Sequence, residues 1–380
     1  MAGVYIHIPF CRQACNYCNF HFATSLRYKN EMMDALLNEI SLTPTPLLSE
    51  RGAEEPDKVE TIYFGGGTPS LLSVEECKLL IEKCKSKFPV TNDAEITIET
   101  NPDDITEEKL QGWKEAGINR LSIGIQSFFE EDLKWMNRAH TASQAINSLQ
   151  SALKLFQNIT VDLIYGTPLL TDEKWKQNVD TVINFGIPHI SCYALTIEPK
   201  TPLDKLIRQK QKEDIDPEKQ ARQFLLLMGW LGEAGYEHYE ISNFAKPGMR
   251  SRHNSSYWRG KNYMGIGPSA HSYNGESRQW NIANNQTYIE SVQKGIIPFE
   301  KEILTSTQKL NEYIMTSLRT MEGLNLGKVD SPEPCLPAGR FRVQSKKFID
   351  EGKMIEENGF LKLTREGKLF ADGIAAELFF

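Results

Sequence analysis

The chain has 380 residues, of which 40% are hydrophobic and 24% are charged, so it holds enough apolar material for a folded core. Lysine and arginine total 43 against 50 for aspartate and glutamate, a net charge of -7, and this balance argues against a protein that binds nucleic acid. No apolar run approaches the about 20 residues of a membrane span, and the opening stretch MAGVYIHIPFC does not resemble a secretory signal. Seven cysteines are too few for a disulfide scaffold, so we expect a cytoplasmic protein whose clustered cysteines bind metal or react.

The first half of the chain repeats a pattern in which a β-branched or aromatic run is followed by a loop and then by helical periodicity. Strands that alternate with helices indicate βαβ units and a parallel sheet. Six such units in about 200 residues favour an α/β fold with an incomplete (β/α)6 barrel over a full eightfold barrel. The predicted strands are Val4–Ile8, Val59–Phe64, Glu95–Glu99, Arg120–Gln126, Thr160–Tyr165 and His189–Leu195.

Changes in composition divide the chain into three predicted domains. Residues 1–202 form the barrel, residues 203–304 form an extension that covers the site, and residues 305–380 form a small helical, winged-helix-like module. Within the extension, Tyr236–Tyr273 is rich in Gly, Asn, Tyr and Trp, a composition that predicts irregular structure. Thr43–Pro56 is predicted to be a flexible insertion, and Pro332–Pro337 a stiff loop without a functional interpretation.

Three cysteines follow the first predicted strand on one short loop, as Cys11, Cys15 and Cys18 in the spacing C-x3-C-x2-C. Three thiolates can hold three irons of a 4Fe–4S cluster, which normally takes four cysteines. The missing fourth ligand leaves one iron open for chemistry, as a catalytic zinc site keeps one position open. The alternatives are a zinc site completed by His7 or His21, or reduced cysteines without a ligand.

The cysteine spacing and its flanking residues, YIHIPFC-x3-C-x-YC from Tyr5 to Cys18, resemble the radical S-adenosylmethionine superfamily. More narrowly, they resemble the oxygen-independent coproporphyrinogen III oxidase family and its haem chaperone branch, HemW. The resemblance runs over about residues 3–375 and implies a 4Fe–4S cluster, S-adenosylmethionine and haem as the bound groups. In this superfamily the open iron chelates S-adenosylmethionine, and an electron from the cluster cleaves its sulfonium bond to give a 5′-deoxyadenosyl radical. The difficult chemistry belongs to the cofactor, while the protein supplies orientation.

Several later motifs place polar residues at the ends of predicted strands, where a βα barrel binds its ligands. The glycines of Gly65-Gly66-Gly67-Thr68-Pro69 let the backbone approach a ligand, although alone they fit a tight turn equally well. A carboxylate such as Glu99 can accept hydrogen bonds from ribose hydroxyls or an ammonium group, or simply cap a helix. Further residues of this kind are Gln126 and Asp162 on the fourth and fifth strands, and Arg138 in the helical segment beyond the fourth.

The resemblance assigns these residues to S-adenosylmethionine. Tyr5, Gly66 and Glu99 match positions that contact one molecule. Positions that contact a second molecule in the oxidase are matched by Tyr17, Gly67, Thr68, Gln126, Arg138 and Asp162.

One departure separates the chaperone from the oxidase. True oxidases carry a fourth cysteine two residues after the third, where this chain has Phe20. The chain also begins directly at the first strand, without the extension of the oxidases, and carries His253-Asn-Ser-Ser-Tyr-Trp258, the HNxxYW motif of the chaperone branch. These features favour a haem chaperone that passes haem to acceptor haem proteins, without coproporphyrinogen oxidase activity. The alternative is an oxidase that decarboxylates coproporphyrinogen III to protoporphyrinogen IX.

Haem candidates come from the same motif. His253 could ligate the iron with Tyr257 and Trp258 beside the porphyrin, or the motif could merely pin its segment to the barrel. Ser251 stands where this branch often has a cysteine, so no thiolate ligand is available there. His271 and His21 are further candidates, Cys77, Cys84 and Cys192 are predicted core residues, and Cys335 is unassigned. Nothing in the chain anchors it to a membrane, although an acceptor protein could bring it there.

Overall fold

The structure, a computed structural model, describes residues 2–44, 58–329 and 338–380. The predicted insertion at Thr43–Pro56 falls largely outside these residues, and the loop Pro332–Pro337 with Cys335 falls entirely outside them. Among the described residues, no helix is long and apolar enough to cross a membrane.

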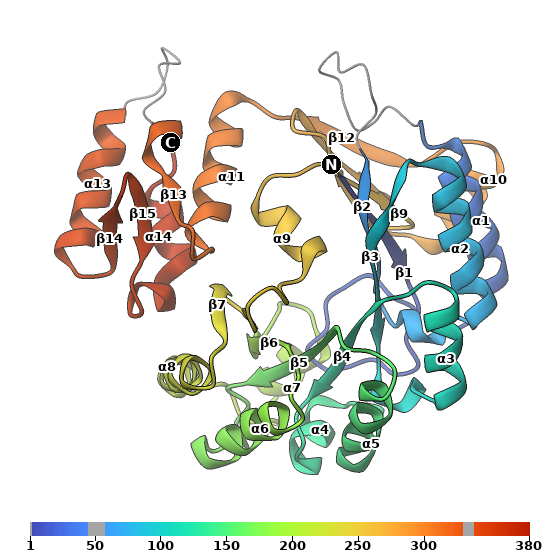
Figure 1. The fold of residues 1–380 in the computed structure, drawn as a ribbon, viewed down its shortest axis with the longest axis horizontal. Helices are drawn as coiled ribbons and strands as arrows, with labels where there is room; N and C mark the ends of the chain where they lie inside the picture. Colours follow the sequence, from blue (N-terminus) through green and yellow to red (C-terminus); the bar gives the residue numbers. More distant parts are fainter. Residues whose placement is uncertain (1, 45–57, 330–337) are drawn as a thin grey trace.

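A single curved sheet dominates the fold (Figure 1). Its central six strands lie in chain order and pair parallel, as the predicted βαβ units require. β1 and β6 do not pair with each other, so the arc stays open and the incomplete (β/α)6 barrel is confirmed. The six strands are β1 (Ala2–Ile8), β2 (Val59–Gly66), β3 (Val90–Thr100), β4 (Arg120–Gln126), β5 (Ile159–Tyr165) and β6 (His189–Ala194).

Helices cover the outer side of this arc (Figure 1). Most of their apolar faces enter the main hydrophobic core, which includes the buried thiols of Cys77 and Cys84 in α2 and of Cys192 in β6, as predicted. Leu133 and Met136 of α4 and Leu203 of α7 belong to a smaller, separate cluster. Ser73 and Glu76 form a reciprocal capping box that starts α2, and Thr141 with Gln144 does the same for α5. These helices are α1 (Lys29–Leu42), α2 (Val74–Lys87), α3 (Glu107–Glu115), α4 (Glu130–Met136), α5 (Ala142–Leu153), α6 (Asp172–Asn184), α7 (Pro202–Arg208) and α8 (Pro217–Glu233).

The segment predicted to be irregular, Tyr236–Tyr273, is instead built from short regular elements, so this prediction is wrong. β9 adds parallel to β1 at one end of the arc, and β8 adds antiparallel to β6 at the other. Strands of three or four residues show no readable periodicity, and their pairing partners are distant in sequence. The elements of the extension are β7 (Glu237–Glu240), β8 (Asn243–Ala245), α9 (Arg252–Trp258), β9 (Tyr263–Ile266), β10 (His271–Tyr273), β11 (Ser277–Asn281), α10 (Asn285–Gln293) and β12 (Phe299–Ile303).

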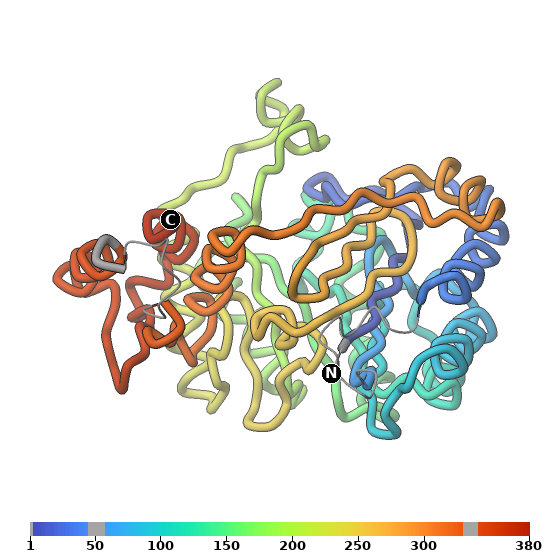
Figure 2. Tube along the Cα trace, turned by 90° about the horizontal axis from the view of Figure 1, so that it is seen from above, coloured from blue at the N-terminus to red at the C-terminus, as the bar shows by residue number. Residues whose placement is uncertain are grey.

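The C-terminal part has a hydrophobic core of its own, formed by residues such as Ile314, Phe341, Leu361 and Ile374. A three-stranded antiparallel sheet in the order β13-β15-β14 packs with helices there, as in winged-helix folds. The division of the chain into three domains stays a prediction. These elements are α11 (Ser306–Leu318), β13 (Leu324–Asn325), α12 (Leu326–Val329), α13 (Ala338–Asp350), β14 (Met354–Glu357), β15 (Phe360–Leu363) and α14 (Ala371–Glu377). Figure 2 shows this module beside the curved sheet, with the orange segment of β12 leading into α11.

Candidate functional site

The cysteine loop connects β1 to α1, and all three of its cysteines are half-buried. The loop is held against the connection between α4 and α5, because Asn137 Nδ2 donates to the Ala14 carbonyl at 2.7 Å and Asn16 N donates to the Met136 carbonyl at 3.1 Å. Asn137 takes a left-handed conformation with φ of 59°, which asparagine tolerates better than most residues. The helix therefore ends where its terminal residues can hold the loop.

The three thiols are free, as a cluster requires. Burial raises the pKa of Cys11 to about 11, a hydrogen bond with Thr68 opposes this shift, and the neighbouring Cys18 and Cys15 add to it. Loading with metal must therefore displace thiol protons. Arg138 supplies the opposing charge, since its Nη1 donates to Cys15 Sγ at 3.3 Å.

A mononuclear zinc site fits this loop poorly. Among the described residues, no three His, Cys, Asp or Glu side chains converge on a position for one metal ion. His7 is occupied on both ring nitrogens, with Nδ1 3.2 Å from the Tyr5 hydroxyl and Nε2 2.9 Å from the His21 carbonyl oxygen. Thiolates that each bind a different iron do not need to converge on one point.

Glu99 lies beside the glycine turn that ends β2. Its Oε1 accepts from the Tyr63 hydroxyl at 2.8 Å and its Oε2 from the Gly66 amide at 3.2 Å. Burial raises the pKa of Glu99 to about 7, and its hydrogen bond with Tyr63 opposes that shift. A carboxylate held in this way by the protein is ready to accept hydrogen bonds from a polar ligand.

The glycine turn has no room for side chains. A Cβ added at Gly67 would lie 2.5 Å from the Phe10 carbonyl oxygen, and one added at Gly66, where φ is 107°, would lie 2.6 Å from the His7 ring. The Gly67 amide also donates to the Ile8 carbonyl at 2.9 Å. Close approach of this turn to the chain entering the cysteine loop therefore requires glycine.

Arg138 links three strand ends. Its Nη2 donates to Asn101 Oδ1 at 2.8 Å and to the Gly124 carbonyl at 2.9 Å. Asn101 in turn donates to the Thr68 hydroxyl at 3.4 Å. Contrary to expectation, Arg138 does not lie in a helix, because α4 ends at Met136 and the left-handed Asn137 turns the chain.

The remaining candidates lie near this group. Burial raises the pKa of Tyr17, the charge of Arg138 opposes this shift, and the nearby Cys15 and Cys18 add to it. Gln126 ends β4 in the left-handed region with φ of 65°. A Cβ added at Gly124 would lie 3.0 Å from Gln126 Nε2 and 3.2 Å from Arg138 Nη2, so these two side chains meet over that glycine.

Asp162 lies on β5. Ser122 Oγ donates to its Oδ2 at 3.2 Å. Burial raises the pKa of Asp162 to about 6, opposed first by hydrogen bonds with Ser191 and Ser122. Its charge also raises the pKa of Glu99, so the two carboxyl groups interact across the inside of the arc.

The structure gives the HNxxYW histidine a structural environment. His253 is 1% exposed, its Nδ1 lies 2.7 Å from the Thr61 hydroxyl, and its Nε2 lies 2.8 Å from the Tyr257 hydroxyl. Glu95 accepts hydrogen bonds from the backbone amides of Arg252 and His253 at the start of α9. With both ring nitrogens occupied, this geometry argues against His253 as an iron ligand and favours the alternative in which the motif pins α9 to β2.

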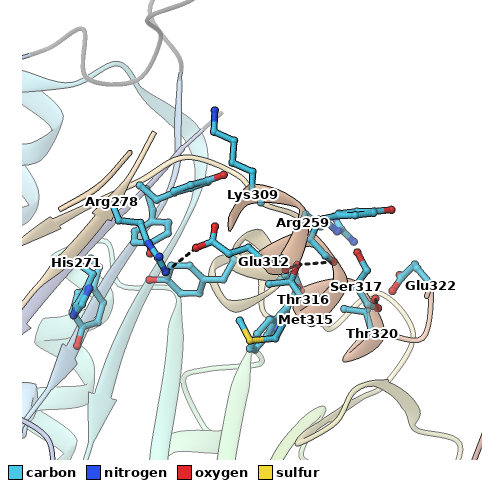
Figure 3. A pocket seen from close by; sticks show the side chains of 18 of the residues that line it. Arg259, His271, Arg278, Lys309, Glu312, Met315, Thr316, Ser317, Thr320 and Glu322 are labelled. Carbon is cyan, nitrogen blue, oxygen red and sulfur yellow. Dashed lines mark hydrogen bonds and ion pairs between the residues drawn. The ribbon is translucent and has the colours of Figure 1, made fainter. Parts of the chain in front are cut away.

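A cavity of about 910 Å³ opens between the arc and the C-terminal module. Its wall includes Asn19, Phe20 and His21 of the cysteine loop, Tyr257 and Trp258 of α9, and side chains of β10 and α11. Figure 3 shows His271 and Arg278 on the strand side, with Glu312 and Met315 of α11 facing them. Pockets of about 300–1,000 Å³ accommodate ligands of cofactor size.

Sequence reasoning missed two asparagines and most of this cavity. Asn101 follows β3 and precedes a proline, a strand-end position where its polar side chain was visible in the sequence. The sequence offered only a weaker indication for Asn137, because asparagine is common at the residue that ends a helix. Cavity residues such as Arg259, directly after α9, and Arg278, in β11, carried no local signal, because only the packing of distant segments brings them together.

Comparisons with known proteins agree with this architecture. The sequence profile of the Radical SAM superfamily matches residues 5–182. "Heme chaperone HemW" of Bacillus subtilis is 32% identical over 378 residues, which cover 98% of each chain. The protein of the same name from Lactococcus lactis is 30% identical and covers 96% of this chain and 94% of its own.

A solved structure shares the fold. Coproporphyrinogen III oxidase (HemN) from Escherichia coli matches with a TM-score of 0.83 and 23% identity, over 100% of this chain and 90% of that one. A sequence identity of 23% establishes a common fold but does not establish a common activity. The full-length similarity to the chaperones, joined to the superfamily match, shows that the chain belongs to the HemW family within the radical SAM superfamily.

Proposed function

We propose that this protein is a haem chaperone, which binds haem in the cavity between the arc and the C-terminal module and passes it to acceptor haem proteins. The observation that best supports this proposal is the lining of the cavity. Asn19, Phe20 and His21 of the cysteine loop line it together with residues from the segments that follow the barrel. Membership of the HemW family supports the same function. An open cavity suits a ligand that must be released intact to a partner.

In this proposal Cys11, Cys15 and Cys18 hold a 4Fe–4S cluster, and Arg138 balances part of the thiolate charge from its position beside Cys15. Such a cluster, with S-adenosylmethionine bound at its open iron, supplies one electron for cleavage of the sulfonium bond. The protein's part is to orient the ligand, to neutralise charge and to exclude competing groups.

We assign the S-adenosylmethionine contacts to two groups of residues. Tyr5 and Glu99 both contact Tyr63, the Gly66 amide donates to Glu99, and Tyr5, Gly66 and Glu99 would hold one molecule beside the cluster. A second molecule, if bound, would lie against the residues assigned by resemblance, which are Tyr17, Gly67, Thr68, Gln126, Arg138 and Asp162. The hydrogen bonds of Arg138 and Asn101 connect several of these residues.

Oxidative decarboxylation of coproporphyrinogen III is the second candidate, and the fold shared with the oxidase favours it. Phe20 argues against it. This side chain is 69% exposed and lines the cavity, at the position where the oxidase pattern has a cysteine. A phenyl ring can contact a porphyrin face but supplies neither a thiol ligand nor redox chemistry.

The test uses the anaerobically reconstituted protein. We expect saturable haem binding, seen as a Soret band that appears on titration, followed by transfer of haem to an apo-haem protein such as apomyoglobin. In parallel, the protein is incubated with coproporphyrinogen III, S-adenosylmethionine and a reductant, with a known oxidase as positive control. Absence of saturable haem binding, or turnover to protoporphyrinogen IX, would overturn the proposal.

A further inference from the structure

His271 differs from the other histidines in its ring contacts. Six of the seven histidines have at least one ring nitrogen at hydrogen-bond distance from a partner. Among the residues that the structure describes, the His271 ring has no such partner. Since unengaged imidazoles are available as metal ligands, this difference points to a ligand that the described residues do not provide.

The position of His271 suits a cavity ligand. It begins β10, is exposed and lines the 910 Å³ cavity (Figure 3). Its ring lies 6.1 Å from that of Trp280, its cross-strand neighbour on β11, which limits its orientation. Partial burial and then the charge of Arg278 lower the pKa of His271, so the imidazole is neutral and keeps a lone pair at neutral pH.

The cations of the cavity divide into two kinds. Arg250, Arg278 and Lys309 are paired with Glu322, Glu312 and Glu276, respectively. Arg259, at the end of α9, and Lys328, in α12, have no carboxylate within ion-pair distance in the described part of the chain. The ammonium of Lys328 lies 4.9 Å from the Tyr313 ring centroid, a contact that leaves its hydrogen-bond donors free for an anion.

A free imidazole and two unpaired cations in the lining of one cavity match the chemistry of a metalloporphyrin that carries two carboxylates. We propose that His271 is the axial ligand to the haem iron, and that Arg259 and Lys328 receive the two propionates. This assignment rests on the proposed function and replaces His253, whose ring nitrogens are occupied within the fold. Met315 of α11 lines the same cavity and offers a thioether as a second, weaker ligand.

The first experiment tests the ligand by optical and electron paramagnetic resonance spectroscopy of haem bound to the reconstituted, full-length protein. We expect His271→Gly to lose the signature of histidine-ligated haem, and added imidazole to restore it, which a misfolded variant could not do. Retention of the wild-type spectrum by His271→Gly overturns the assignment. Loss of that spectrum in His21→Ala, while His271→Gly keeps it, also overturns the assignment and transfers the ligand to His21, which lines the same cavity.

The second experiment compares haem with haem dimethyl ester, which keeps the iron but lacks the propionate charges. We expect Arg259→Gln and Lys328→Gln each to weaken haem binding about tenfold and to leave binding of the ester unchanged, because a charge-assisted hydrogen bond is lost. Arg252→Gln is the matched control, since Arg252 begins the helix that Arg259 directly follows, pairs with Asp93 and does not line the cavity. Equal weakening for both ligands, or no weakening for either, overturns the propionate assignment.

Failure of this inference differs from failure of the proposed function. If the wild-type protein binds no haem, the chaperone proposal itself falls, whatever the variants do. If the wild-type protein binds haem and the variants behave as wild type, only the assignment to these three residues falls.

Discussion

Nη1 of Arg138 lies 3.3 Å from Sγ of Cys15, a contact between segments that are 123 residues apart in the chain. Through Nη2 the same guanidinium reaches Asn101, directly after β3, and the Gly124 carbonyl, near the end of β4. One cation thus ties the cysteine loop to two neighbouring strand ends. Because thiolates repel one another, a buried positive charge of this kind favours their deprotonated, metal-binding form.

Replacing Arg138 should therefore weaken cluster loading. We expect Arg138→Met to retain less iron and sulfide per protein than the wild type, since about 1.5–3 kcal/mol of charged hydrogen bonding is removed. Arg138→Lys should give an intermediate result, because it keeps the charge but loses the forked geometry. The control is Arg222→Met, which removes an exposed arginine of α8 that pairs with Asp172 of α6. Equal iron content in Arg138→Met and the control would contradict the role of this contact.

The cysteines of the loop and of the core should respond differently to substitution. Cys15→Ala is expected to lose the brown colour and the iron and sulfide of the 4Fe–4S cluster after anaerobic reconstitution. Cys84→Ala removes a thiol that is 0% exposed in the main core, so it should keep the cluster and lose about 1 kcal/mol of stability. Iron analysis and urea denaturation measure the two effects. A Cys15→Ala protein that carries the full cluster would remove Cys15 from the ligand set.

Glu99 should make the affinity for S-adenosylmethionine depend on pH. The ionised carboxylate is the better acceptor, and its pKa is raised to about 7 by burial, so binding should strengthen as pH rises through about 7. Glu99→Gln should bind about tenfold more weakly at high pH and lose this part of the pH dependence. Calorimetric titration of both proteins across this range isolates the contribution of Glu99, because the titration of the ligand is common to both.

The control for this measurement is Glu107→Gln, which changes an exposed glutamate that pairs with Lys154. It should show wild-type affinity and pH dependence. An unchanged pH profile in Glu99→Gln would mean that another group controls binding.

The glycine turn gives a steric prediction. Gly67→Ala would place Cβ 2.5 Å from the Phe10 carbonyl oxygen, so it should displace the residue that precedes Cys11 and lower both the melting temperature and cluster loading. Gly232→Ala is the matched control, because a Cβ at this position in α8 meets nothing within 4 Å. It should raise helix stability slightly. Similar behaviour of the two variants in thermal unfolding and iron analysis would refute the close-packing argument.

Glu39 should contribute to the pH dependence of stability. This buried carboxyl group accepts hydrogen bonds from Gly267 N and Asn281 Nδ2, each at 2.6 Å, and from Tyr288. Burial outweighs them and raises its pKa from 4.5 to about 7. The folded state therefore binds a proton that the unfolded state releases, and its stability should decrease on the order of 3 kcal/mol as pH rises from about 4.5 to 7 and beyond.

Urea unfolding at about pH 5 and about pH 8 measures this effect. Glu39→Gln should be less stable than wild type at low pH, because an amide cannot accept all three hydrogen bonds, and its stability should depend less on pH. A slope equal to that of the wild type would show that Glu39 does not titrate in this range.

Features encoded in short stretches of sequence were predicted well. Arg120–Gln126 is a strand with the predicted bounds, and the six parallel strands follow from alternation of short apolar runs with helical periodicity. The cysteine spacing and the glycine turn are equally local, because residues within a few positions of each other must lie close together in any fold. The buried thiols of Cys77 and Cys84 follow from their seven-residue separation on an amphipathic helix.

Only the tertiary structure showed which distant groups meet. His253 and Thr61 are 192 residues apart, and their 2.7 Å contact argues against His253 as an iron ligand and favours its structural role. The pairing of β9 with β1 and the cavity that exposes His271, Arg259 and Lys328 have the same origin. Sequence periodicity determines which face of an element is buried, whereas the partners of a side chain depend on how separate elements pack, and that information is spread over the whole chain.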